Sequence, residues 1–159
     1  MNKKLFKSLL AAFAIGAPMY SNAQIISTIA GTGTAAFSGD GGQATSAAIN
    51  TPHGIAVDGA GVVYITDQAN QRIRKITTAG VISTIAGSGS LGFSGDGAAA
   101  TTASFNNPFT TWIDGTGDIL FSDSYNNRIR KINTSGIITT IAGTGTAGST
   151  GDGSLATAA

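Results

Sequence analysis

The sequence predicts an all-β protein made of four-stranded antiparallel units, and three observations lead to this expectation. A block of 56 residues occurs twice in strict register. Within each block, short runs rich in β-branched residues alternate with Gly, Asn and Asp, which favour turns. After residue 23 no stretch shows a sustained helical period, so α-helical and mixed folds are not expected.

The repeat relates residues 29–84 to residues 85–140, and the two blocks are identical at 28 of 56 positions without a gap. Residues 126–143 (NNRIRKINTSGIITTIAG) accordingly match residues 70–87 (NQRIRKITTAGVISTIAG). Half identity in strict register indicates duplication of one structural unit, because low complexity alone does not keep such a register.

Each block divides into four predicted strands, which in the first block are residues 54–57, 62–66, 72–76 and 81–85. The turns between them are short enough for an antiparallel meander. Residues 62–65 are all apolar, which predicts that both faces of the sheet are covered. Four-stranded units that cover one another's faces are the blades of a β-propeller.

The predicted architecture is therefore a β-propeller present as an incomplete ring, with about two full blades plus partial ones. Residues 24–30 match the outer strand of a blade, residues 31–86 and 87–142 each hold a linker and a blade, and residues 143–159 hold a partial linker. We expect a fragment of a longer product of about six repeats. The alternative is a short protein that builds its ring by self-association.

The sequence patterns of the first block resemble the NHL repeat. They are Pro-x-Gly-Ile-Ala-Val-Asp (52–58), Val-Tyr-Ile-Thr-Asp (63–67) and Asn-x-Arg-Ile-Arg-Lys-Ile (70–76). The segments Ile-Ser-Thr-Ile-Ala-Gly and Ser-Gly-Asp-Gly resemble a bacterial secreted subtype. The resemblance covers residues 24–159 and implies a β-propeller, usually of six blades. The second block departs from the pattern after Pro108, where Phe109-Thr110-Thr111-Trp112 replaces His53-Gly54-Ile55-Ala56.

Residues 1–23 have the features of a secretory signal peptide. Three lysines precede the apolar run Leu9 to Ala17, and small residues follow at Ser21-Asn22-Ala23. A membrane anchor is the alternative, but the run is shorter than the roughly 20 residues needed to span a bilayer. We therefore expect a secreted, periplasmic or cell-surface protein with no membrane span after signal removal.

The charge of residues 24–159 does not favour nucleic acid as a partner. Six basic side chains stand against eight aspartates, a net charge of −2. Some NHL proteins bind RNA, and Arg72, Arg74 and Lys75 recur in the second block as a basic run. No set of aromatic residues for base stacking is interleaved with that run. The sequence contains no cysteine, so stability must come from packing and hydrogen bonds.

Asp67 with Arg72, and their counterparts Asp123 with Arg128, flank the predicted turn between the second and third strands. A carboxylate at such a place accepts backbone N–H bonds and pairs with the arginine. Because both blocks carry the pair, we interpret it as structural. Asn70 and its counterpart Asn126 are expected to occupy the left-handed position of the turn.

Four large residues depart from the repeat or are unique, and they are our candidates for a binding site: His53, Phe109, Trp112 and Tyr125. The alternative is that they only repack the blade. We predict no catalytic residue, since the lone histidine has neither cysteine nor glutamate to help it build a zinc site or a triad.

We expect no metal and no other cofactor. Each linker offers one aspartate, at Asp40, Asp96 or Asp152, whereas calcium needs about six or more oxygen ligands. These aspartates are expected to cap turns instead.

The function that this reading favours is a secreted scaffold that binds an extracellular protein or glycan. The alternative is a fragment of a lactonase-like or lyase-like propeller enzyme whose catalytic residues lie in missing blades. A structural component of the cell envelope is a third class, because fold alone does not decide function.

Overall fold

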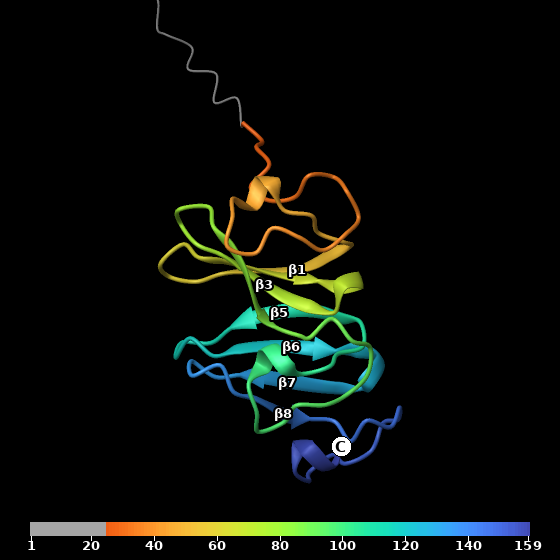
Figure 1. The fold of residues 1–159 in the computed structure, drawn as a ribbon. Coiled ribbons are helices and arrows are strands. Elements are labelled where there is room, and N and C mark those ends of the chain that lie inside the picture. The colour runs from red at the N-terminus through yellow and green to blue at the C-terminus, as the bar shows by residue number, and fades with distance from the viewer. Residues whose placement is uncertain (1–24) are drawn as a thin grey trace, which may run out of the picture.

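A computed structural model describes residues 25–159, so the predicted signal peptide, residues 1–23, lies outside the described part. The chain forms two four-stranded antiparallel sheets in which consecutive strands are neighbours (Figure 1). Blade 1 consists of β1 (Pro52–Val57), β2 (Val63–Asp67), β3 (Arg72–Ile76) and β4 (Ile82–Ala86). Blade 2 consists of β5 (Pro108–Ile113), β6 (Ile119–Asp123), β7 (Arg128–Ile132) and β8 (Ile138–Ala142). The predicted all-β fold of propeller blades is confirmed, and the strands of the first block lie within two residues of their predicted bounds.

Short 3-10 helices occupy equivalent places in the two repeats and in the last partial linker. They are η1 (Ala44–Ser46), η2 (Gln68–Asn70), η3 (Ala100–Thr102), η4 (Ser124–Asn126) and η5 (Ala156–Ala158). Three residues are too few to show a helical period, which is why the sequence did not predict them. Within residues 25–159, no helix is long and apolar enough to cross a membrane.

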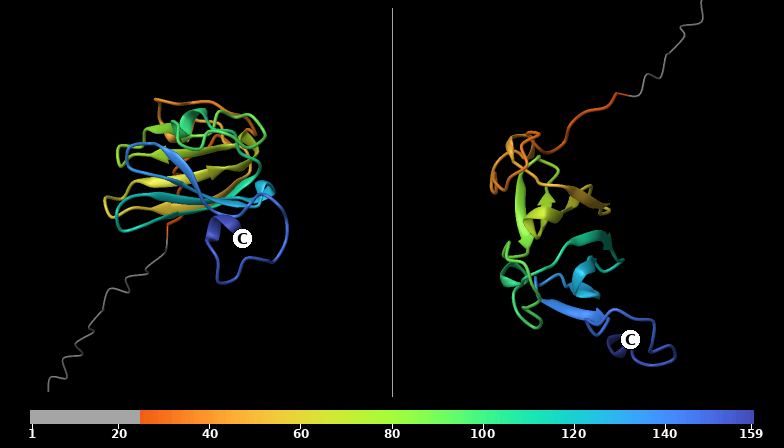
Figure 2. Two further views of the ribbon diagram at one scale, coloured as in Figure 1. Left: turned by 90° about the horizontal axis from the view of Figure 1, so that it is seen from below. Right: turned by 90° about the vertical axis from the view of Figure 1, so that its right-hand side faces the viewer.

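The innermost strands β1 and β5 lie side by side, as expected for blades arranged around a common axis (Figure 2). Residues 25–30, predicted as an outer strand, run without strand pairing, and Ile25 and Ile26 are exposed. An isolated segment becomes a stable strand only when its backbone can form hydrogen bonds with the free edge of a sheet. In the described part of the chain, no strand lies beside residues 25–30.

Each blade has a near face, covered by the linker that precedes it, and an opposite far face. The far face of blade 1 packs on the near face of blade 2 and forms one apolar core with linker 2 (residues 87–107). Ile73 contributes to this core from β3, Phe121 from β6 and Phe105 from linker 2. A second core lies between the near face of blade 1 and linker 1 (residues 31–51), where Ile65, Ile76 and Ile82 meet Ala44 and Ala47. Blade 1 is thus covered on both faces, as its apolar second strand predicted.

The two blades approach most closely where β1 and β2 meet β5. The hydroxyls of Thr66 and Thr111 are hydrogen-bonded at 2.5 Å across this joint. Gly54 makes the approach possible, because a Cβ atom there would lie 2.6 Å from Thr66 Oγ1 and 2.7 Å from the backbone oxygen of Phe109. The second block carries Thr110 instead of glycine at this place, where no further blade packs on it within residues 25–159.

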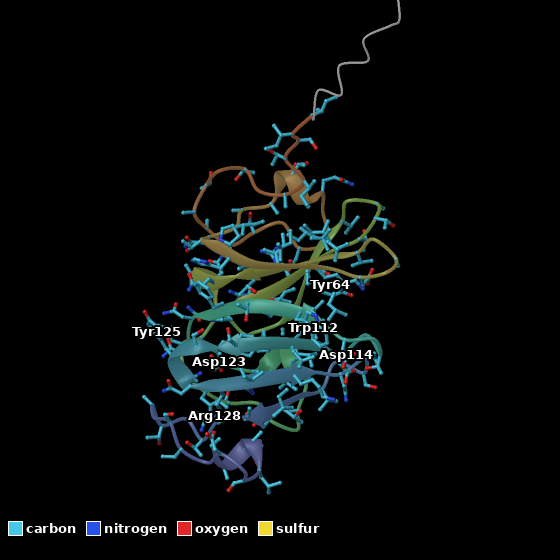
Figure 3. All side chains as sticks on the ribbon, turned by 180° about the vertical axis from the view of Figure 1, so that it is seen from behind. Tyr64, Trp112, Asp114, Asp123, Tyr125 and Arg128 are labelled. Carbon is cyan, nitrogen blue, oxygen red and sulfur yellow. The ribbon has the colours of Figure 1, made fainter. Side chains whose placement is uncertain are left out.

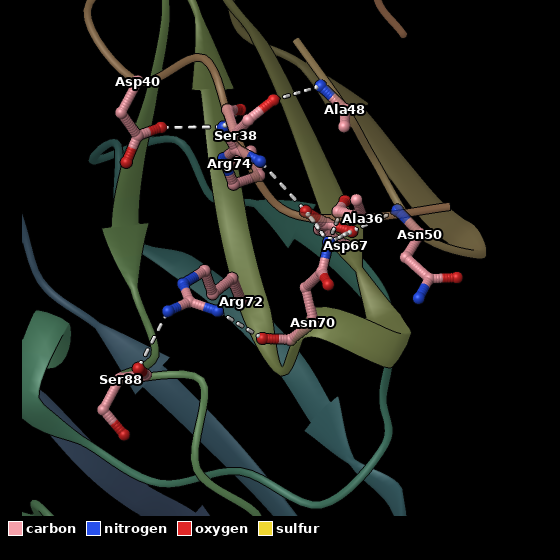
Figure 4. A network of polar contacts seen from close by, with 10 residues as sticks. All are labelled: Ala36, Ser38, Asp40, Ala48, Asn50, Asp67, Asn70, Arg72, Arg74 and Ser88. Atoms are coloured by element: carbon pink, nitrogen blue, oxygen red, sulfur yellow. Dashed lines mark hydrogen bonds and ion pairs between the residues drawn. The ribbon is translucent and has the colours of Figure 1, made fainter. Parts of the chain in front are cut away.

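A fully buried arginine ties each linker to its blade (Figure 4). Arg74 donates hydrogen bonds to Asp67 Oδ2 at 3.0 Å, to Asp40 Oδ1 at 2.7 Å and to the Ser38 carbonyl at 3.0 Å. Blade 2 repeats the arrangement around Arg130, which pairs with Asp123 at 3.2 Å and with Asp96 at 2.8 Å. We call each set an arginine clamp, made of the buried arginine, the aspartate that ends the second strand and the aspartate of the linker.

The predicted pairing of Asp67 with Arg72, and of Asp123 with Arg128, is therefore wrong. Asp67 and Arg72 oppose each other in the sheet, but the Arg72 guanidinium donates to the carbonyls of Asn70 and Ser88 and lies 3.7 Å above the Phe37 ring. The carboxylate of Asp67 turns instead to Arg74 and accepts hydrogen bonds from Asn70 Nδ2 and the Asn50 N–H.

Two further expectations about the turns are corrected. The left-handed residues are Gln71 (φ 54°) and Asn127 (φ 50°), which each follow a 3-10 helix, and not Asn70 and Asn126. Asp40 and Asp96 pair with buried arginines instead of capping turns, since the linkers fold over the near faces.

The arginine clamp predicts a large difference between two neighbouring arginines. Arg74→Met leaves Asp67 buried without its cationic partner, and we expect a loss of about 3–5 kcal/mol in the free energy of unfolding. Arg72→Met, the matched control, removes hydrogen bonds to two carbonyls at a half-buried site and should cost about 1–2 kcal/mol. Urea unfolding measures both values, and equal losses would contradict the clamp.

The interblade contact at Gly54 predicts that one methyl group disturbs the stacking. In Gly54→Ala the new methyl meets backbone atoms that cannot move without separating the blades, and we expect a loss of about 1–3 kcal/mol. Gly59→Ala is the control, because no heavy atom lies within 4 Å of its added Cβ. Thermal unfolding followed by circular dichroism tests this, and an unchanged midpoint for Gly54→Ala would refute it.

Candidate functional site

The structure brings together two of the four candidate binding residues. His53 and Phe109 occupy the same position in the two repeats, near the starts of β1 and β5. Because these strands lie side by side, the two rings meet with centroids 4.3 Å apart and planes tilted by 31°. Both side chains are exposed, so the pair forms an aromatic surface near the inner edge of the blades.

Tyr125 lies at the same end of the blades. It belongs to η4, directly after β6, and β6 ends at Asp123, which is paired with Pro108 at the start of β5. The Tyr125 N–H also donates to the Asn106 carbonyl at 3.0 Å, which fixes the backbone. The Tyr125 side chain is exposed. We call the surface of His53, Phe109 and Tyr125 the aromatic end.

Hydroxyl groups lie close to the aromatic end. Thr110 and Ser122 are hydrogen-bonded through their side chains at 3.0 Å, and Ser124 reaches Ser122 at 3.4 Å. We did not single out these residues from the sequence. A usable signal was present, since Thr110 replaces Gly54 and Ser122 replaces Thr66 in the repeat.

Trp112 does not join the other candidates. It lies on β5 opposite Leu120, on the far face of blade 2, and is 59% exposed. Seen from behind, it lies toward the end marked by Asp114, whereas Tyr125 lies at the opposite side with Asp123 and Arg128 (Figure 3). The candidates chosen because they depart from the repeat therefore lie on two different surfaces: the aromatic end and, for Trp112, the far face of blade 2.

The repeat region matches a described family. Residues 20–94 match the model of the Teneurin NHL domain. This stretch, 75 of the 159 residues, is similar to NHL-type repeats. It is 40% identical to Teneurin-1 of Gallus gallus over 75 residues, which cover 43% of this chain and 3% of that protein. It is 47% identical to human Teneurin-4 over 53 residues, which cover 33% of this chain and 2% of that protein.

Solved structures similar to these NHL-type blades share the fold. A protein of unknown function from Bacteroides thetaiotaomicron aligns with a TM-score of 0.54 and 24% identity, over 64% of this chain and 26% of that one. An auxiliary nutrient binding protein from Bacteroides ovatus aligns with a TM-score of 0.51 and 22% identity, over 63% of this chain and 27% of that one. This chain thus spans about a quarter of each of those structures.

Carboxylates of the NHL-type blades differ in their environment. Asp114, in the exposed β5–β6 turn, accepts hydrogen bonds from the Thr116 hydroxyl at 2.6 Å and from the N–H groups of Thr116 and Asp118, and these bonds lower its pKa. Burial raises the pKa of Asp123, against the opposing effects of hydrogen bonds from Asn106 and Asn126 and the charge of Arg130. Asp123 serves the arginine clamp and lies beneath the surface, so it is not part of the aromatic end.

The aromatic end of the NHL-type blades combines exposed rings with nearby hydroxyl groups. Exposed aromatic faces gain free energy by covering apolar surface of a ligand, and nearby hydroxyls orient it. Within residues 25–159, no three side chains of His, Cys, Asp or Glu lie close enough together to hold a metal ion.

An NMR titration that follows the side-chain carboxyl carbons of the aspartates tests these environments. We expect the midpoint of Asp114 below the ordinary value of 3.8 and that of Asp123 above it. Thr116→Val removes a donor and should move the midpoint of Asp114 back toward 3.8. The reverse order of the two midpoints would contradict the structure.

The two shifts have opposite effects on stability. A lowered pKa gives Asp114 a stabilising effect that is present above its unfolded pKa and is lost as pH falls through the folded pKa. The raised pKa of Asp123 means that its burial as a carboxylate costs stability near neutral pH; this cost decreases as pH falls through its folded pKa and is gone below its unfolded pKa.

Proposed function

We propose that this protein is a binding scaffold that is exported from the cell and presents its aromatic end to an extracellular protein or glycan. The observation that carries the proposal is the exposed pair of His53 and Phe109, held 4.3 Å apart on adjacent inner strands, with Tyr125 at the same end. These rings do not contribute to either apolar core.

The backbone beneath the rings is well suited to present them. His53 and Phe109 each lie at a bulge of their strand, next to the paired residues Pro52 and Pro108, and the backbone of Tyr125 is held by its hydrogen bond to Asn106. Side chains with few rotatable bonds on a rigid backbone lose little conformational entropy when a ligand binds. Flat aromatic surfaces stack against the apolar faces of sugars and anchor protein interfaces in the same way.

Export rests on the sequence of residues 1–23, whose basic start, apolar run and small final residues are typical of a signal peptide. The net charge of −2 in residues 24–159 disfavours nucleic acid as a partner.

Binding by the aromatic end predicts the effect of removing its rings. Protein recovered from the exported fraction is applied to a glycan array and to immobilised extracellular proteins, and its mature N-terminus is checked for Gln24 by mass spectrometry. We expect Phe109→Ala and Tyr125→Ala each to weaken binding about tenfold, because buried aromatic anchors contribute more than about 1 kcal/mol each.

Leu155→Ala is the matched control, since Leu155 is exposed but belongs to the last linker. It should bind like the unchanged protein. Binding that survives both aromatic substitutions, or a product retained with residues 1–23 in the cytoplasm, would count against the proposal.

A further inference from the structure

A groove lies between the two blades, and both of its walls belong to repeats that the structure describes. Its volume is about 240 Å³. Blade 1 lines it with Tyr64 and Lys75, which oppose each other on β2 and β3. Blade 2 lines it with Ile119 and Ile132, at the margin of the apolar core between the blades, and with the β7–β8 turn. We call this place the interblade groove.

Lys75 differs from the other basic side chains of residues 25–159. Five of them donate hydrogen bonds to a carboxylate or a backbone carbonyl, and these are Arg72, Arg74, Arg128, Arg130 and Lys131. Within the same range Lys75 has no ion-pair partner, although it is half-buried. Its ammonium group can therefore bind an anion without giving up an existing contact.

Comparison of the two repeats shows why Lys75 has no partner. In blade 2 its counterpart Lys131 donates to Asp118 Oδ2 at 2.8 Å. The place of Asp118 is taken in blade 1 by Val62, whose side chain has no acceptor. One substitution between the repeats thus leaves a lysine of blade 1 available to a ligand.

Asp58 does not neutralise Lys75, because its carboxylate is engaged in its own turn. Asp58 Oδ1 accepts the N–H groups of Ala60 and Val62, each at 2.9 Å, and Oδ2 accepts the Tyr64 hydroxyl at 3.3 Å. The hydrogen bond from Val62 and, more weakly, the charge of Lys75 lower the pKa of Asp58. The two groups interact through their charges but do not form an ion pair.

The β7–β8 turn supplies uncharged polar groups on the opposite wall. Asn133 Oδ1 accepts the N–H groups of Ser135 and Ile137, each at 3.0 Å, which fixes the side-chain amide. Asn133 Nδ2 and the Thr134 hydroxyl have no acceptor within residues 25–159, and both residues line the groove. The interblade groove therefore combines a cation, an aromatic ring, an amide and a hydroxyl.

We propose that the interblade groove binds a carboxylated sugar. The carboxylate pairs with Lys75, the apolar face of the pyranose ring packs on Tyr64, and the ring hydroxyls bond to Asn133 and Thr134. Lys75 carries the only charge among the lining residues, so an anionic group is favoured. Aromatic rings cover the apolar faces of sugars, and amides and hydroxyls can donate to sugar oxygens.

The size and lining of the groove favour a single sugar ring over other anions. Sites for drug-sized ligands have volumes of about 300–1,000 Å³, so a groove of about 240 Å³ suits a smaller group. An inorganic phosphate would leave the apolar wall uncovered. A glutamate side chain of a partner protein would satisfy Lys75 but would leave Asn133 and Thr134 without partners.

The interblade groove is separate from the aromatic end, and this proposal does not rest on the proposed function. Seen from behind, Tyr64 lies on the same side as Asp114, whereas Tyr125 lies on the opposite side (Figure 3). No residue of the aromatic end lines the groove.

NMR titration of the full chain with galacturonic acid and with galactose tests the proposal. The two sugars differ only in that the first has a carboxylate where the second has a hydroxymethyl group. We expect galacturonate to shift the amide signals of Lys75 and of residues 133–136. It should bind about tenfold more tightly than galactose, because the carboxylate adds a charge-assisted hydrogen bond.

Two substitutions remove the cation in different ways. Lys75→Gln should abolish the preference for galacturonate over galactose. Val62→Asp gives Lys75 the partner that Lys131 has, and should weaken galacturonate binding about tenfold. The fold accommodates an acid there, since the second and third strands of the two blades have the same register. Circular dichroism establishes that each variant is folded.

The matched control removes the ion pair of blade 2 without changing the net charge. The double variant Asp118→Asn with Lys131→Gln should bind galacturonate like the unchanged protein, because neither side chain lines the groove. Tyr125→Ala should also bind it unchanged, even if ligand binding at the aromatic end is lost. Failure of this proposal is thereby distinguished from failure of the proposed function.

Three results would overturn the proposal. The first is equal affinity of the unchanged protein for galacturonic acid and galactose. The second is a preference for galacturonate that survives both Lys75→Gln and Val62→Asp. The third is tighter binding of N-acetylglutamic acid amide, a carboxylate without a sugar ring, which would assign the groove to an acidic side chain of a partner protein.

Discussion

The burial of one guanidinium group in each repeat is the constraint on which the rest of the structure depends. Arg74 and Arg130 are fully buried, and a buried charge is tolerated only when it is paired and hydrogen-bonded. Two carboxylates from distant parts of the chain, Asp67 and Asp40 for Arg74, meet this need. The linker is thereby held over the near face of its blade, where Ala44 and Ala47 complete the apolar core.

Once the linker is held, the position of the next blade follows. Linker 2 carries Phe105 into the core between the blades, and the chain then enters β5 beside β1. Gly54 permits the close approach of these inner strands. The meeting of His53 and Phe109 is therefore a consequence of blade stacking, and the aromatic end exists only because the two repeats are in contact.

The repeats present two surfaces with different chemistry. The aromatic end combines exposed rings with hydroxyl groups, which suits a ligand with apolar and polar parts. The far face of blade 2 is a sheet face that exposes Trp112 and Ile129. Trp112 belongs to the second surface, so it can be tested independently of His53, Phe109 and Tyr125.

The sequence by itself determined the strands, their order and the repeat, because short runs of β-branched residues, turn-forming residues and a 56-residue period are local or periodic signals. Only the tertiary structure decided that Asp67 pairs with Arg74 instead of Arg72, since this choice depends on Asp40 and Ser38, more than 30 residues away in the chain. It likewise separated Trp112 from His53, Phe109 and Tyr125. The physical reason is that a residue's partners depend on the neighbouring blade and linker, which no local pattern in the chain encodes.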